Sequence, residues 1–370
     1  MNSLSVLIKP ASGLCNMNCK YCFYNDLMEN RKIKDYGFMS LKTLEIIVKK
    51  SMLLENKNVN FMFQGGEPML IGLDFYISLI SLVEKYNLYG INVTYGIQTN
   101  GTLITNQFAK FFSENDFLVG ISIDGFKEIQ DIYRLDKDGT STFNSTISGL
   151  EQLKKHDVDF NILSVVTNEV SENTTDIYSF LKNLGTDYIQ FIPYISRVNE
   201  EEDIEFLTNS NYLRFLKELF DLWYLDFTNG KIVSIRYFDD IIKIVMGYSA
   251  ESCTLRGVCS NQNVIEADGS IYPCDFYVLD NWRIGNIYDY TFKEVLESNI
   301  LKGFIESSRV INSVCKECRY YNLCKGGCLK NQNSSINDKR YLSKYCEVYK
   351  SFFDYSLERF IEVGEVLRNR

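Results

Sequence analysis

The sequence has a single histidine, His156, among its 370 residues. His156 lies in a charged stretch at the end of a predicted helix, where we expect it to be solvated rather than catalytic. Histidine is the side chain that most often transfers protons in enzymes. With no other histidine, the chain must take any general base from its carboxylates, lysines or tyrosines.

The chain also lacks a long apolar run and an excess of positive charge. No segment approaches the roughly 20 apolar residues that cross a bilayer, and the N-terminus is too short in apolar length for a secretory signal. We therefore expect a soluble, cytoplasmic protein without a membrane partner. The net charge is −9 with both signs interspersed, which offers no basic face for phosphates, so nucleic acid is not expected as a partner.

Apolar segments typical of strands alternate with helical patterns up to about residue 230. The predicted strands are residues 5–8, 59–63, 93–98, 118–123, 160–166 and 188–194. The predicted helices are residues 41–53, 75–86, 107–114, 142–155, 174–184 and 211–227. Six alternating units predict parallel strands with right-handed crossovers, fewer than the eight of a closed barrel. We predict an α/β fold in which residues 1–230 form a partial (β/α)6 TIM-like barrel, with its chemistry at the C-terminal strand ends.

The pattern changes after residue 230, where cysteines and turns separate short apolar pieces and the apolar periodicity is weaker. The predicted short strands are residues 232–237, 264–266 and 270–272. Bound metal supplies folding free energy where an apolar core is small. We therefore predict a second, cysteine-rich domain over residues 231–350. A helical pattern at residues 347–366 predicts that residues 351–370 form a closing helix.

No cysteine lies between Cys22 and Cys253, and this gap divides the eleven cysteines into three and eight. A cubane iron–sulfur cluster takes four ligands, so eight thiolates can hold two complete clusters, and three can hold one cluster with an open iron. Metal ligation is favoured over disulfides in the cytoplasm. Structural zinc wants four ligands, which makes it a poor alternative for the group of three. Two zinc sites in the group of eight remain an alternative.

The first group has the spacing Cys15-x3-Cys19-x2-Cys22, with Tyr21 before the last cysteine, directly after the first predicted strand. This loop resembles the signature of the radical S-adenosylmethionine (SAM) family. The resemblance implies that SAM chelates the open iron and that its reductive cleavage yields a 5′-deoxyadenosyl radical. That radical removes a hydrogen atom from an unactivated carbon, while the protein supplies position and excludes side reactions.

Further motifs at the ends of successive predicted strands match positions where this family contacts SAM. A Gly-Gly-Glu-Pro motif ends the second strand, and in the family it meets the SAM amino group. Arg134 offers a guanidinium fork for the SAM carboxylate, and Ile195 would pack on adenine. Each signal is weak alone, because glycine turns and loop Ser–Asp pairs are usually structural. The expected SAM-binding residues are Tyr21, Gly65, Gly66, Glu67, Ser122, Asp124, Arg134 and Ile195.

The second group of cysteines resembles the SPASM domain, an extension of radical SAM enzymes that modify peptides and proteins. The usual pattern supplies seven cysteines, and Cys253 is an eighth, so both auxiliary clusters can be fully ligated. The expected ligands are Cys253, Cys259, Cys274 and Cys328 for the nearer cluster and Cys315, Cys318, Cys324 and Cys346 for the farther one. The resemblance therefore implies three 4Fe-4S clusters and SAM as cofactors.

Six segments narrow the resemblance to the anaerobic sulfatase-maturating enzymes. They are residues 7–12, 22–24, 63–68, 98–104, 234–239 and 272–277. The resemblance implies oxidation of a Cys or Ser side chain, in an unfolded sulfatase or a substrate peptide, to Cα-formylglycine. The deoxyadenosyl radical takes a β-hydrogen, a base removes the thiol or hydroxyl proton, and a second electron leaves toward an auxiliary cluster. We expect a monomer that uses an external electron donor such as flavodoxin or ferredoxin; the choice between Cys and Ser stays open.

Asp275 is the expected base, because it follows the cluster ligand Cys274 at the boundary where substrate would lie. A cluster with four thiolates is negative and should raise the pKa of a carboxyl beside it, toward a range useful to a base. The alternative is an aspartate that only orients Cys274. The expected substrate contacts, at positions that are also often structural, are Tyr24, Gln64, Gln98 and Arg236.

The sequence leaves two other functions open. The first is another SPASM maturase that forms thioether or carbon crosslinks in a ribosomal peptide, although such enzymes often carry a leader-recognition domain, which is not expected here. The second is an electron carrier or a zinc-scaffolded binding protein. Three four-iron clusters would give about twelve irons per chain, and SAM cleavage separates an enzyme from a carrier. The acidic stretch 193–209 either sets substrate selectivity or is a solvated loop.

Overall fold

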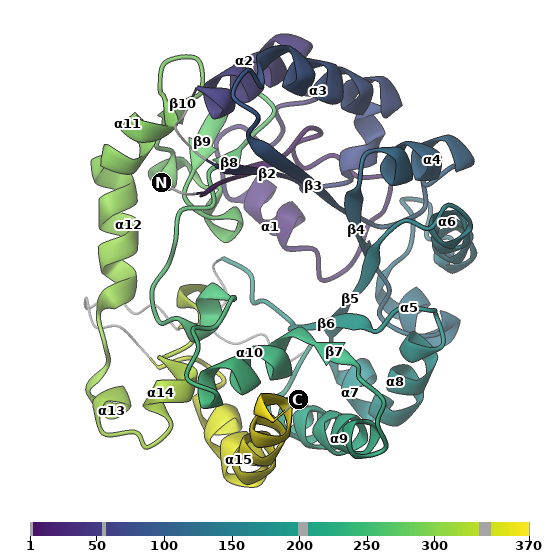
Figure 1. Ribbon diagram of the computed structural model, residues 1–370, viewed down its shortest axis with the longest axis vertical. Helices are drawn as coiled ribbons and strands as arrows, with labels where there is room; N and C mark the ends of the chain where they lie inside the picture. The colour runs from purple at the N-terminus through teal and green to yellow at the C-terminus, as the bar shows by residue number, and fades with distance from the viewer. Residues whose placement is uncertain (1–2, 54–56, 199–205, 333–341, 370) are drawn as a thin grey trace. The chain divides into compact units, whose positions relative to one another are not determined.

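The computed structural model describes residues 3–53, 57–198, 206–332 and 342–369. The chain forms two compact units, each described here by itself, and Figure 1 traces their strands and helices. The first unit comprises Met1–Ile123, Asp131–Phe160 and Ser260–Phe304. The second unit comprises Asp124–Gln130, Asn161–Cys259 and Ile305–Arg370.

Four parallel strands form the centre of the sheet in the first unit. They are β1 (Ser3–Ile8), β2 (Asn58–Phe63), β3 (Asn92–Thr99) and β4 (Phe117–Ser122). The helices between and after them are α2 (Leu41–Met52), α3 (Leu73–Tyr86), α4 (Asn106–Glu114) and α6 (Phe143–Lys155). Ser40 caps the N-terminus of α2, because its side chain accepts a hydrogen bond from the Thr43 backbone N–H. The side chains of Ile8, Phe63 and Ile97 are fully buried, whereas the first residues of these strands, Ser3, Asn58 and Asn92, are exposed.

Three short strands from late in the chain extend this sheet beyond β1. They are β8 (Val264–Ile265), β9 (Ser270–Tyr272) and β10 (Gly285–Asn286). β8 runs parallel to β1, with Ile265 opposite Ile8, while β9 pairs antiparallel with both β8 and β10. The pairing brings residues that follow β8 and β9 to the C-terminal end of β1, although they are far away in sequence.

The second unit contains a parallel sheet of β5 (Phe160–Val166), β6 (Tyr188–Pro193) and β7 (Ser234–Ile235). Its main helices are α7 (Asn168–Glu172), α8 (Thr174–Lys182), α9 (Asn209–Thr228), α10 (Arg236–Val245) and α15 (Cys346–Arg368). α15 confirms the predicted closing helix. It packs against α9 and α10 through an aromatic core that is centred on Phe220.

One predicted strand is wrong for most of its length. Residues 232–237 were expected to be extended, but only Ser234 and Ile235 form a strand, and α10 begins at Arg236. Phe238, Ile241 and Ile242 are buried at helical spacing. Burial of this apolar face favours a helix from Arg236 onward, although the short apolar run before it is typical of a strand.

Shorter elements complete the two units. These helices are α1 (Phe23–Glu29), α5 (Lys127–Tyr133), α11 (Phe292–Glu297), α12 (Asn299–Arg309), α13 (Ser313–Lys316), α14 (Tyr321–Cys324) and the 3-10 turns η1 (Pro68–Ile71), η2 (Cys253–Leu255), η3 (Asp275–Tyr277), η4 (Asp280–Trp282) and η5 (Leu329–Asn331). None of the described helices is long and apolar enough to cross a membrane. The compact units interleave early and late segments of the chain, and the domain boundaries at residues 230 and 350 stay a prediction.

Replacing Phe220 by alanine should lower the free energy of unfolding by about 3–5 kcal/mol, because it leaves a cavity in the aromatic core. Phe220 is fully buried, and its ring centroid lies 4.5 Å from Phe360 and 5.6 Å from Phe238. Anaerobic urea unfolding followed by near-UV circular dichroism measures the change. Leu225→Ala on the same helix is the control, since Leu225 is 59% exposed and its loss should be nearly neutral. Equal effects of the two variants would contradict this placement of the core.

Candidate active site

The first three cysteines occupy the loop that joins β1 to α1. Cys22 immediately precedes α1, and its backbone N–H donates to the Cys19 carbonyl at 3.1 Å. The Cys15 sulfur accepts a hydrogen bond from the Met17 backbone N–H at 3.3 Å. Each of the three side chains is partly exposed. One short loop therefore presents three thiols, with backbone donors directed at their sulfur atoms.

The thiols of this loop suit a metal cluster. Burial raises the pKa of Cys15 to about 11, and the Met17 N–H opposes this shift. Burial likewise raises the pKa of Cys22, against hydrogen bonds from the Asn25 and Tyr24 backbone N–H groups. Such donors stabilise thiolates, and bound metal removes the thiol proton. No three His, Cys, Asp or Glu side chains of the described residues converge on one ion, but a four-iron cluster binds each thiolate at a separate corner.

The Gly-Gly-Glu loop after β2 packs directly against the cysteine loop. The Gly66 N–H donates to the Ser12 carbonyl at 3.0 Å, and the Glu67 N–H donates to the Leu14 carbonyl at 2.7 Å. A Cβ atom at Gly66 would lie 2.0 Å from the Leu14 oxygen, and one at Gly65 would lie 2.7 Å from the Ser12 oxygen. The structure thus requires both glycines because protein backbone already fills this space.

Glu67 holds the ends of β2 and β3 together. Its fully buried carboxylate accepts hydrogen bonds from the Met69 N–H at 3.0 Å, the Thr99 hydroxyl at 2.8 Å and the Asn100 N–H at 2.8 Å. Burial raises the pKa of Glu67 to about 6, and these donors oppose the shift. The carboxylate therefore joins the loop after β2 to the end of β3, and a contact of Glu67 with SAM stays a prediction.

Tyr21, which lies within the cysteine loop, contacts Arg134. The Arg134 guanidinium donates to the Tyr21 hydroxyl at 2.9 Å, and its charge lowers the pKa values of Cys15 and Glu67. The Lys20 N–H donates to the Tyr133 carbonyl at 3.0 Å and fixes this contact. The structure therefore brings together five of the expected SAM-binding residues, namely Tyr21, Gly65, Gly66, Glu67 and Arg134.

The other expected residues of the SAM and substrate sites are divided between the two units. Ser122 ends β4 and Gln98 lies half-buried in β3, both in the first unit. In the second unit, the buried Asp124 accepts from the Val165 N–H at 2.9 Å. In that unit Ile195 follows β6, half-buried, and Arg236 donates to Gln190 at 3.3 Å. Of the acidic stretch 193–209, residues 199–205 lie outside the described residues.

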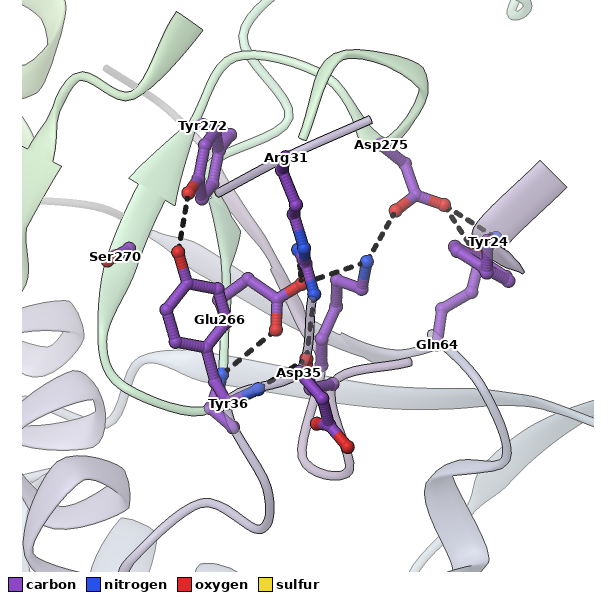
Figure 2. Close-up of polar contacts among 12 residues, drawn as sticks. Tyr24, Arg31, Asp35, Tyr36, Gln64, Glu266, Ser270, Tyr272 and Asp275 are labelled. Atoms are coloured by element: carbon purple, nitrogen blue, oxygen red, sulfur yellow. Dashed lines mark hydrogen bonds and ion pairs between the residues drawn. The ribbon is translucent and has the colours of Figure 1, made fainter. Parts of the chain in front are cut away.

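Asp275 is buried in the first unit, at the start of η3, and Figure 2 shows its contacts. Its Oδ2 atom accepts from the Tyr24 hydroxyl at 2.6 Å and from the Gln64 amide at 3.1 Å. Its backbone N–H donates to the Gln262 side chain at 2.9 Å. Burial raises the pKa of Asp275, while the charge of Lys9 and the Tyr24 hydrogen bond oppose it. The shift has the expected direction, and burial is its main cause within the protein.

Sequence reasoning missed the charged residues behind Asp275. Lys9 lies in one of the segments that carry the family resemblance, but it was given no role, and Arg31 and Glu266 were not singled out. All three are buried and charged. One signal could have found them. Lys9 directly follows an apolar strand, and a lysine in such a place is expected to be buried and to need an ionic partner.

The seven cysteines of the second unit fall into two groups. The pKa of Cys324 is raised to about 11, chiefly by burial and also by the charges of Cys346, Cys315 and Cys318. These four cysteines line a single cavity together with Tyr320, Tyr349 and Phe353. They correspond to the expected ligands of the farther cluster.

The second group of cysteines in this unit is Cys253, Cys259 and Cys328. The pKa of Cys328 is raised to about 12, chiefly by burial and also by the charges of Cys253 and Cys259. Asp240 fixes the approach to Cys253, since its carboxylate accepts from the Ser252 N–H at 3.0 Å. The fourth expected ligand, Cys274, belongs to the first unit, where it follows β9. The ligand set of the nearer cluster stays a prediction.

Two protein-family models match the chain, one in the region of the first three cysteines and one that begins at Cys253. The Radical SAM superfamily matches residues 10–181, and SPASM, an iron-sulfur cluster-binding domain, matches residues 253–319. These matches confirm the predicted fold class, a partial α/β barrel with an iron–sulfur extension.

Individual relatives match over the whole chain. The cysteine-type anaerobic sulfatase-maturating enzyme of Clostridium novyi (strain NT) is 46% identical over 372 residues, with 100% of both chains covered. The serine-type enzyme of Bacteroides thetaiotaomicron is 32% identical over 371 residues, covering 95% of this chain and 89% of that one. The solved structure described as "Native anSMEcpe with bound AdoMet and Cp18Cys peptide" has a TM-score of 0.94 at 44% identity, covering 99% of each chain.

Proposed function

The chain belongs to the anaerobic sulfatase-maturating enzymes of the radical SAM superfamily, and from this premise we propose that its target is a cysteine of a sulfatase. The enzyme oxidises a side chain of a protein or peptide to Cα-formylglycine. Its cofactors are 4Fe-4S clusters and SAM. The higher identity to the cysteine-type relative than to the serine-type relative supports cysteine as the preferred residue.

The observation that carries the proposal is the placement of a buried carboxylate next to the cysteine loop. Tyr24 lies two positions after Cys22, and its hydroxyl donates to Asp275 at 2.6 Å. Gln64, which ends β2 beside the glycine loop, donates to the same oxygen. A buried carboxylate therefore lies beside the loop proposed for the radical cluster, which supports Asp275 as the base.

The reaction removes one hydrogen atom, one proton and one further electron from the target cysteine, which is a two-electron oxidation. When bound, the clusters and SAM supply the 5′-deoxyadenosyl radical, which takes a β-hydrogen atom, and the acceptor for the remaining electron. Asp275 accepts the thiol proton, and Tyr24 and Gln64 hold its carboxylate in place. The resulting thioaldehyde takes up water and releases hydrogen sulfide, which leaves the aldehyde of formylglycine.

The remaining residues and partners follow from the same proposal. Tyr21, Gly65, Gly66, Glu67 and Arg134 shape the SAM site around the cysteine loop, as their contacts with that loop support. An external one-electron donor such as flavodoxin or ferredoxin reduces the enzyme, which works as a monomer in the cytoplasm. Dense cysteine without disulfides supports a reducing compartment.

Two peptides with the pattern Cys-x-Pro-x-Arg and Ser-x-Pro-x-Arg test the proposed function. Reduced enzyme with SAM should convert the cysteine peptide to an aldehyde that reacts with a hydrazine, with loss of the sulfur atom and faster than the serine peptide. Mass spectrometry measures both products. SAM cleavage without any peptide change would refute the activity, and retention of sulfur in a crosslinked product would favour a peptide maturase instead. Faster turnover of the serine peptide would overturn only the proposed preference.

A further inference from the structure

Four buried charges of alternating sign form a row in the first unit, from Arg31 through Glu266 and Lys9 to Asp275. Figure 2 labels three of them, Arg31, Glu266 and Asp275. The Arg31 guanidinium lies 2.7 Å from Glu266 Oε1, and the Lys9 ammonium lies 3.2 Å from the same oxygen. Lys9 Nζ lies 3.9 Å from Asp275 Oδ1. The row holds two cations and two anions, so it is neutral as a whole when Asp275 is ionised.

Lys9 is fixed at the centre of this row. It directly follows β1, and its backbone N–H donates to the Ile265 carbonyl at 2.9 Å. Its ammonium lies 4.7 Å from the centroid of the Tyr24 ring, and only 2% of its surface is exposed. Contacts on several sides therefore hold the flexible Lys9 side chain in one position.

Glu266 and Arg31 hold the other end of the row. Burial alone would raise the pKa of Glu266, but the charges of Lys9 and Arg31 outweigh it and lower the pKa, so Glu266 remains a carboxylate. Arg31 also donates to the Ser12 hydroxyl at 3.1 Å, which joins the row to the cysteine loop. The neutralisation of Glu266 is thus shared between two cations.

The two oxygens of Asp275 have different surroundings. Oδ2 accepts hydrogen bonds from both Tyr24 and Gln64. Oδ1 is buried and accepts no hydrogen bond from the described residues, and Lys9 Nζ faces it from beyond hydrogen-bond distance. Lys9 is therefore the cation that faces Oδ1, while hydrogen bonds anchor the opposite oxygen.

We propose that Lys9 is a positioning residue that fixes the orientation of the Asp275 carboxylate when this group accepts the thiol proton of the substrate. The inference rests on the proposed function, in which Asp275 is the base. An ammonium at this distance attracts Oδ1 without occupying it, so the carboxylate is oriented and remains able to accept a proton. Without the ammonium, Asp275 keeps its anchor at Oδ2 but loses the charge that fixes Oδ1.

A purely structural role makes a different prediction. In Lys9→Met the row keeps one cation against two anions, so Glu266 and Asp275 are no longer balanced. The double variant Lys9→Met/Glu266→Gln restores the balance, with Arg31 against Asp275, but still lacks an ammonium at Oδ1. If Lys9 only neutralises Glu266, the double variant should recover full function; if Lys9 positions Asp275, it should recover stability alone.

The test measures formylglycine formed per 5′-deoxyadenosine with a cysteine peptide that is dideuterated at the β-carbon. We expect this ratio to fall at least about tenfold in both Lys9 variants, with tenfold corresponding to about 1.4 kcal/mol. Deuterium should still enter 5′-deoxyadenosine, and iron content should match the wild type in the double variant. The comparison thus separates hydrogen abstraction from the proton removal that follows it.

Each other outcome overturns the proposal. An unchanged ratio in Lys9→Met, or recovery of the ratio in the double variant, would assign Lys9 to the neutralisation of Glu266. Loss of iron from both variants would assign it to folding. Asp275→Asn is measured in parallel. An unchanged ratio in this variant would show that Asp275 is not the base and would refute the mechanism in the proposed function. A lower ratio in Asp275→Asn with an unchanged ratio in the Lys9 variants would reject only the role of Lys9.

Discussion

Asp275→Asn is expected to lower the rate of formylglycine formation by about 10²–10⁴-fold, the usual contribution of a general base. Asparagine has nearly the same shape and can still accept the hydrogen bond of Tyr24, which lies 2.6 Å from the carboxylate. It cannot take up the thiol proton. Hydrogen abstraction depends on the cysteine loop, so SAM cleavage should persist while product formation fails.

The measurement compares 5′-deoxyadenosine and aldehyde in the same reaction. Asp289→Asn serves as the matched control, because Asp289 is an exposed carboxylate of the first unit. The control should retain the wild-type ratio of the two products. A normal ratio in Asp275→Asn would show that another group removes the proton, and equal loss of both products would point to a folding defect.

Gly66→Ala is expected to remove the radical cluster while leaving the auxiliary clusters bound. The added Cβ atom would lie 2.0 Å from the Leu14 carbonyl oxygen, and real Cβ atoms do not approach backbone so closely. Relief requires the cysteine loop to move away from β2, which breaks the Gly66 to Ser12 hydrogen bond. Iron should fall from about twelve to about eight per chain, and SAM cleavage should fall at least about a hundredfold.

Iron and acid-labile sulfide analysis, together with 5′-deoxyadenosine formation, measures this effect. Gly303→Ala is the control, since a Cβ atom at Gly303 in α12 meets nothing within 4 Å and alanine favours a helix. The control should keep all clusters and full activity. Normal iron content in Gly66→Ala would mean that the cysteine loop tolerates the displacement. It would contradict the prediction that the radical cluster depends on Gly66.

Much of the fold was predictable because its signals are local. Strand and helix periodicity placed β1 to β6 and the helices α2, α3, α4, α6, α8 and α9 with small errors at their ends. Ser40 marked the start of α2 through its own side chain. The helix α10 was missed because the apolar run before Arg236 is too short to distinguish a strand from a helix. Its type depends on which residues the core buries.

The candidate site was predictable in its chemistry and less so in its contacts. Asp275 and Tyr24 were proposed as base and substrate contact from a resemblance, and the structure shows a hydrogen bond between them. The glycines of the loop after β2 were expected among the SAM-binding residues, which stays a prediction, and their close contact with the backbone of the cysteine loop was not foreseen. Close backbone approaches between distant segments leave no trace in local periodicity.

The sequence by itself determined the number and grouping of the thiols, and therefore the capacity for three iron–sulfur clusters, because ligand type and spacing are properties of the chain. The tertiary structure alone decided the surroundings of Asp275. Tyr24 and Gln64 precede it by 251 and 211 positions. They meet it because β8 pairs with β1 and carries the late segment to the end of the early one. Burial at that junction places Lys9 and Glu266 beside the base.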